Sequence, residues 1–158
     1  DYYIVVEGVG ATDEGDFTLE ISGAAPPAET CEEPNTINEL GTYTTDTSLL
    51  GNNQTLTCSS TSSSTESVFA WTAPNDMTVR ATTANSLFDT ALEVRATDCS
   101  SSSAAVVCND DEDLPGGVST STLTFDATSG TTYYFIVSGW SGAQGAAYLN
   151  LESSENPL

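Results

Sequence analysis

Residues 66–96, ESVFAWTAPNDMTVRATTANSLFDTALEVRA, hold three strand-like runs separated by turn residues. Glu66–Ala73 is rich in β-branched and aromatic residues, and Pro74 ends it because proline cannot donate a hydrogen bond inside a sheet. In Asp76–Thr83 and in Thr90–Ala96, apolar residues alternate with polar ones, as is typical of a half-buried strand. The stretch therefore predicts three strands that pack one face against a core.

The last of these runs has the clearest pattern. Leu92 and Val94 are expected to face the core, and Glu93 and Arg95 are expected to face solvent. Similar runs lie on both sides of the stretch, at residues 42–50, 54–58, 106–108, 119–127, 131–138 and 145–152. Turns rich in Gly, Pro, Asn and Ser separate them, and no stretch keeps a helical period. The chain is therefore predicted to be all-β, as a jelly-roll-like antiparallel β-sandwich.

The two ends of the chain repeat each other. Residues 1–22, DYYIVVEGVGATDEGDFTLEIS, align with residues 132–153, TYYFIVSGWSGAQGAAYLNLES. Both copies have a Tyr-Tyr pair, an aliphatic run, a turn that contains glycines and an alternating second run. We expect each copy to form a β-hairpin.

This repeat predicts the domain organisation. Residues 1–22 are the terminal hairpin of a preceding or neighbouring unit, 23–35 a linker, 36–153 a complete sandwich and 154–158 a tail or linker. The chain starts at Asp1 inside a strand-like run. We therefore expect that its native start was removed by processing, or that the chain is a piece of a longer protein. A covalent array with a period of about 130 residues is one interpretation. The other is a separate subunit that gives its N-terminal hairpin to a neighbour.

The charge of the chain excludes several classes of function. It has 2 Lys and Arg residues together, 23 Asp and Glu residues and no His, for a net charge of -21. Nucleic-acid binding needs basic side chains, and so does attraction to an anionic membrane. There is no apolar run long enough to span a membrane, and without His or Lys the usual catalytic triads and dyads cannot form. Carboxylates, hydroxyls and backbone remain, and these suit calcium; adaptation to high salt is a competing explanation for the acidity.

The chain has 4 cysteines, Cys31, Cys58, Cys99 and Cys108. An even number in a chain rich in Ser and Thr indicates two disulfides and an oxidising compartment. Of the three pairings, we expect the sequential one, Cys31–Cys58 and Cys99–Cys108. A zinc site is disfavoured because no Cys-x-x-Cys spacing occurs.

Four segments carry a resemblance to a known family: ESVFAWTAP (66–74), SLFDTALEV (86–94), CNDD (108–111) and GTTYYFIVSGW (130–140). In this order and spacing, the region from Cys31 to Glu152 resembles the bacterial pre-peptidase C-terminal domain family. The resemblance implies a small, generally non-catalytic β-sandwich that is appended to secreted proteins, often proteases, and found in repeats. It also implies that calcium, or an insoluble substrate such as collagen or polysaccharide, is a candidate ligand.

The densest group of oxygen side chains follows Cys108. We expect calcium to be held by Asp89, Asn109, Asp110, Asp111 and Asp113. The alternative is a solvated acidic turn, in which Asp89 caps its own turn. Trp140 lies in a Gly-Trp-Ser-Gly turn and is a candidate ligand or inter-unit contact.

These observations favour a non-catalytic, secreted structural module of a repeat array or cell-surface filament, stapled by disulfides and calcium. Its partners would be copies of itself, and possible ligands are polysaccharide or extracellular protein. The alternative is a substrate-binding accessory module of a secreted hydrolase, which an exposed aromatic strip around Trp140 would support. That this chain is itself a hydrolase is nearly excluded, because it has no His and no Lys.

Overall fold

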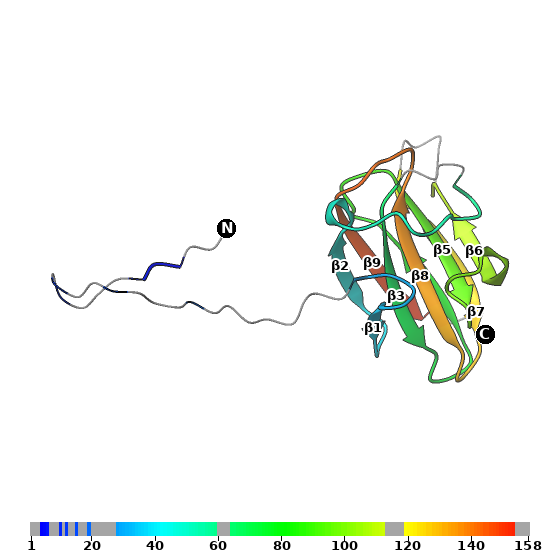
Figure 1. Ribbon diagram of the computed structural model, residues 1–158. Helices are drawn as coiled ribbons and strands as arrows, with labels where there is room; N and C mark the ends of the chain where they lie inside the picture. Colours follow the sequence, from blue (N-terminus) through cyan, green and yellow to red (C-terminus); the bar gives the residue numbers. More distant parts are fainter. Residues whose placement is uncertain are drawn as a thin grey trace.

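A computed structural model of the chain describes residues 4–6, 10, 12, 15, 19, 28–59, 64–112 and 119–153. Its strands form two facing sheets (Figure 1). The first sheet has the order β1 (Asn35–Ile37), β3 (Glu66–Thr72), β8 (Thr132–Gly139), β5 (Thr90–Ala96) and β6 (Ala105–Asn109). The second has the order β2 (Thr42–Asp46), β9 (Ala146–Ser153), β4 (Met77–Thr82) and β7 (Thr122–Ala127). Two short 3-10 helices, η1 (Thr47–Leu49) and η2 (Ser102–Ala104), lie in the connections.

The prediction of an all-β sandwich is confirmed. In the described part of the chain every strand pair is antiparallel except β1 with β3. The runs of alternating residues became β4 and β5, and the run that ends at Pro74 became β3. Period-two patterning fixes these elements because one face of each strand is buried against the opposite sheet.

The main core lies between the sheets and is built around aromatic rings. Trp71 of β3, Phe125 of β7 and Tyr133 and Phe135 of β8 are all buried in it. The ring centroids of Phe125 and Tyr133 are 4.9 Å apart, a spacing that favours a tilted aromatic pair. This core positions the ends of β5, β6 and β8, where the predicted ligands lie.

A second, smaller apolar cluster lies on the outer face of the five-stranded sheet. Val68, Ala91 and Ile136 alternate with main-core residues along their strands, so they point to the opposite side of the sheet. Leu56 covers them, together with Cys99. Residues 54–58 were predicted to be a strand, and this was wrong: they form an irregular segment held over the outer face. We call residues 51–59 the strap.

The strap also corrects the prediction for Glu93 and Arg95. Both point away from the main core, as expected, but neither is solvent-exposed: Glu93 is 0% and Arg95 1% exposed. The two form an ion pair, with Arg95 Nε 2.6 Å from Glu93 Oε1. A strand pattern predicts which face a residue is on, but not whether a distant loop covers that face.

The predicted disulfide pairing was also wrong. The bonds join Cys31 to Cys99 and Cys58 to Cys108, with Cα–Cα distances of 5.4 Å and 5.6 Å. Sequential pairing assumed that neighbours along the chain are neighbours in space. In the fold, the strap crosses the outer face and brings Cys58 to β6, while Cys31 meets the segment that follows β5.

The C-terminal copy of the repeat is not a hairpin. β8 lies between β3 and β5 in one sheet, and β9 lies between β2 and β4 in the other. Most of the N-terminal copy and residues 154–158 lie outside the described residues, so the predicted division into units stays a prediction. Within the predicted linker, Glu29 already contacts the sandwich, because its carbonyl oxygen accepts a hydrogen bond from Val68 N.

Candidate functional site

The predicted ligands meet at one end of the sandwich. Register places the start of β5 beside the end of β8 and the end of β6, with Thr90 opposite Gly139 and Leu92 opposite Asn109. Asp89 therefore lies next to Trp140, whose backbone N–H donates to the Asp89 carbonyl oxygen at 3.0 Å. We call this end, with the connections that follow β4, β6 and β8, the acidic end.

The buried hydroxyl groups of Thr83, Thr90 and Ser121 form a hydrogen-bond network next to the acidic end. The side-chain oxygens of Thr83 and Thr90 are 2.6 Å apart, and Ser121 N donates to Thr83 Oγ1 at 2.8 Å. Ser121 Oγ lies 2.7 Å from the Thr90 carbonyl oxygen and 2.8 Å from that of Asp110. This network joins the residue after β4, the first residue of β5 and the residue before β7, and it holds the backbone of Asp110 through the Ser121 hydroxyl.

Carboxylates at this end raise each other's pKa values. Burial, then the charges of Asp111 and Asp89, raise the pKa of Asp110 to about 6. Burial and Asp111 also raise the pKa of Asp89. Like charges and partial burial both disfavour the ionised form. Asp89, Asp110 and Asp111 therefore lie close enough to affect one another electrostatically.

The charge of this group is not neutralised by a basic side chain. Arg80, the cation at this end, pairs with Glu112 at 3.6 Å and with Glu152 at 2.7 Å. Asp110 Oδ1 is buried and has no hydrogen-bond partner among the described residues. An oxygen in that situation fits a cation ligand, because a bound cation would replace the missing partner.

The other two predicted ligands are Asn109 and Asp113. The Asn109 side chain makes hydrogen bonds within the fold. Its Nδ2 donates to the Asp111 carbonyl oxygen at 3.0 Å, and its Oδ1 accepts from Thr122 N at 3.0 Å. Asp113 lies outside the described residues. Within the described ranges, no three Asp, Glu, His or Cys side chains are grouped closely enough to enclose a metal ion. A cation here would therefore also need backbone oxygens or water, as calcium commonly uses.

The strap is held by buried charges that the sequence analysis placed in solvent. Arg95 donates to the carbonyl oxygens of Cys99 at 2.6 Å and Thr55 at 2.8 Å. Glu93 Oε2 accepts from Thr57, at 2.5 Å from its N and 2.6 Å from its Oγ1. One signal was present: Arg95 is one of only 2 basic residues and follows a Glu at the same-face spacing of a strand.

Glu66 is a third buried charge under the strap. Its Oε1 accepts from Asn53 N at 2.5 Å, while Oε2 is buried and without a hydrogen-bond partner among the described residues. Burial raises the pKa of Glu66 to about 7, despite hydrogen bonds from Asn53 and Gln54 that favour the ionised form. The strap is therefore anchored to a carboxyl group that titrates near neutrality.

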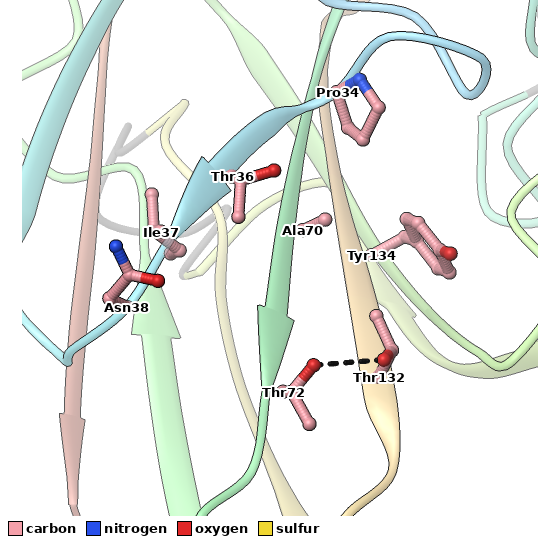
Figure 2. A pocket seen from close by; sticks show the side chains of 8 residues that line it. All are labelled: Pro34, Thr36, Ile37, Asn38, Ala70, Thr72, Thr132 and Tyr134. Atoms are coloured by element: carbon pink, nitrogen blue, oxygen red, sulfur yellow. Dashed lines mark hydrogen bonds between the residues drawn. The ribbon is translucent and has the colours of Figure 1, made fainter.

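Beside β1, the outer face of the five-stranded sheet forms a groove of about 320 Å³ (Figure 2). It carries one aromatic ring, Tyr134, beside the hydroxyls of Thr72 and Thr132, which are 2.9 Å apart. Its full lining is Pro34, Thr36, Ile37, Asn38, Ala70, Thr72, Thr132 and Tyr134.

Trp140 does not extend this groove into an aromatic strip. It follows the end of β8, whereas Thr132 is the first residue of that strand, so the groove and Trp140 lie toward opposite ends of β8. Trp140 is half-buried. The exposed large apolar side chains of the described residues are all aliphatic.

The comparisons agree with this architecture. No protein-family model matches the chain, and no curated protein matches it. In three dimensions it is similar to the pre-peptidase C-terminal domain of collagenase from Bacillus anthracis, with a TM-score of 0.51 and 11% identity. The match covers 82% of this chain and 100% of that domain. The likeness shows a pre-peptidase-C-terminal-like fold and confirms the resemblance at that level.

Proposed function

We propose that this pre-peptidase-C-terminal-like sandwich is a non-catalytic, extracellular structural module, repeated along a longer chain and stapled by disulfides and calcium. The observation that carries the proposal is the repeat. Residues 132–153 supply a central strand to each sheet, and residues 1–22 have the matching sequence. The chain therefore carries more strand sequence of this type than one sandwich uses.

The two disulfides fit an extracellular structural role. The disulfides connect residues 68 and 50 positions apart, so they tie the strap and the N-terminal segment to the five-stranded sheet. Such long-range bonds persist in oxidising compartments. Helices in the described ranges are too short and polar to cross a membrane.

Calcium is the proposed second staple, at Asp89, Asp110 and Asp111. The support is the raised pKa of Asp89 and of Asp110, caused by burial and then by neighbouring carboxylates, and the buried Oδ1 of Asp110, which has no hydrogen-bond partner among the described residues. A divalent cation would remove this repulsion and join the connection before β5 to the one after β6. The residues present thus fit a hard cation bound through oxygen atoms.

Light scattering of the purified chain, in millimolar calcium and again in EDTA, tests the array. Because β8 and β9 already fill their places in the sandwich, the chain is expected to be monomeric in both. Calcium-dependent filaments would contradict a covalent array and favour separate subunits. Calorimetric titration with calcium tests the staple, and Asp110→Asn should abolish the heat of binding that Glu112→Gln retains.

The groove beside β1 favours one second candidate, a substrate-binding accessory module. Tyr134 and neighbouring hydroxyls could contact a sugar ring or an extended protein chain. The structurally similar domain belongs to a collagenase, so fibrous collagen and insoluble polysaccharides are the first probes. Co-sedimentation that Tyr134→Ala abolishes would support this role, and no co-sedimentation with any probe would exclude these substrates.

A further inference from the structure

Matched aliphatic residues of the two copies differ strongly in their exposure to solvent. Phe135, Ile136 and Val137 of β8 are all 0% exposed, and Leu149 of β9 is 1% exposed. Their counterparts in the N-terminal copy are Ile4, Val5, Val6 and Leu19, which are 58%, 82%, 49% and 51% exposed. Exposing three consecutive large aliphatic side chains, at Ile4, Val5 and Val6, is costly in water and marks an interaction segment.

The pattern of the N-terminal copy suits a strand buried on both faces. Along β8, Phe135 and Val137 belong to the main core, while Ile136 belongs to the outer cluster with Leu56 and Cys99. Ile4, Val5 and Val6 keep an apolar residue at each of these positions. A strand with that pattern needs a facing sheet on one side and a strap on the other.

An intact copy of this sandwich has no place for such strands. β8 pairs with β3 and with β5 at seven positions each, and β9 pairs with β2 and β4. The edge strands of the described sheets are β1, β6, β2 and β7. Adding a strand at an edge would not reproduce burial on both faces and pairing on both sides. The acceptor must therefore lack its own β8 and β9.

We propose that residues 1–22 supply strands β8 and β9 to a second sandwich, whose other strands come from a segment equivalent to residues 29–131. This rests on the proposed function, because it identifies the partner that a repeated unit would need. Thr132 begins the C-terminal copy, so a copy of residues 29–131 joined before Asp1 would reproduce the same order of strands. The connection between Gly8 and Gly15 is one residue longer than its counterpart, a small change for a surface loop.

One position indicates that the natural acceptor differs in sequence from residues 29–131. Phe17 matches Ala147, which is 1% exposed in the main core. A phenylalanine in that space would overpack a core shaped for alanine. The natural acceptor is expected to have smaller side chains opposite this residue, and Phe17→Ala should relieve the mismatch in a test that uses this chain's own segment.

The test is a fusion in which a copy of residues 29–131 precedes the full chain 1–158 that carries Phe17→Ala. If the proposal holds, the cysteines of the added copy form the same disulfides as Cys31–Cys99 and Cys58–Cys108. They then resist alkylation, and the added copy resists protease. The same fusion with Val5→Asp should lose both protections in the added copy only. Val106→Asp in the full-chain part, a change at another exposed aliphatic residue, is the matched control and should lose neither.

The proposal is overturned if the Val5→Asp change makes no difference to the added copy. This holds whether the added copy is alkylated and digested in both fusions or is protected in both. Light scattering and calcium titration of the original chain do not involve the added copy. The proposed function can therefore fail while this inference holds, and the reverse.

Discussion

Glu66 makes the stability of the fold depend on pH in an unusual direction for a carboxyl group. Burial raises its pKa from 4.5 to about 7, so the folded state holds a proton that the unfolded state has released between these values. Stability should therefore fall as the pH rises from about 4.5 to about 7, by up to roughly 3 kcal/mol. Denaturant unfolding of Glu66→Gln across this window should show a shallower pH dependence than the unsubstituted chain.

Asp110 contributes in the same direction, because its pKa is raised to about 6. The slope of Glu66→Gln should therefore be reduced without reaching zero. Glu39→Gln, a change at an exposed carboxyl group in the β1–β2 connection, is the control and should keep the full slope. Identical slopes for Glu66→Gln and Glu39→Gln would show that Glu66 is ionised in the folded state near pH 5.

Replacing Arg95 is expected to lower the free energy of unfolding more than replacing any exposed charged residue. Arg95→Met would leave Glu93 buried without its cation and the carbonyl oxygens of Thr55 and Cys99 without their donors. Breaking a buried ion pair from one side costs about 3–5 kcal/mol, whereas an exposed pair contributes about 0–1 kcal/mol. Urea unfolding should therefore show a large loss for Arg95→Met and a small one for Arg80→Met. Similar losses for the two variants would mean that the strap does not seclude Arg95 from water.

At the scale of elements, the strap should loosen while the sandwich stays folded. Replacing Cys58 and Cys108 together by alanine removes a bond that joins residues 50 positions apart, worth on the order of 4 kcal/mol in the chain-entropy model. Hydrogen exchange should accelerate at Thr57 N, which donates to Glu93 across the strap. Exchange in β8 should change less, because β3 and β5 pair with it on both sides. Equal acceleration at both places would show that strap and sheet unfold as one unit.

The strands that could be predicted from sequence are those whose pattern reports burial directly. β3 has an apolar run, and β4 and β5 alternate apolar and polar residues. Such a local pattern is enough to predict a strand without knowing which other segments pack on it. β1 has only three residues, and its parallel pairing with β3 is set by the chain around it. The disulfide pairing failed for the same reason, since it depends on where the strap crosses.

The acidic site shows the same division. Asp89 could be grouped with the residues after Cys108 because SLFDTALEV and CNDD are both segments that carry the family resemblance. The engagement of Asn109 with Thr122 could not be predicted, because the β6–β7 connection decides it. Likewise, β8 and β9 are consecutive strands of the kind that usually pair, yet the turn between them carries the chain from one sheet to the other.

At the scale of the whole molecule, a net charge of -21 leaves two explanations for the acidity, calcium binding and adaptation to high salt. Salt screens every exposed carboxylate, with a Debye length of about 10 Å at 0.1 M, so it should raise the melting temperature gradually. Calcium at Asp89, Asp110 and Asp111 should raise it at much lower concentration, because a site binds by mass action. Thermal unfolding in calcium chloride and in sodium chloride of equal ionic strength separates the two effects. An advantage for calcium that Asp110→Asn removes and Glu112→Gln keeps would assign the stabilisation to the acidic end, whereas equal curves in both salts would mean that the charge serves screening alone.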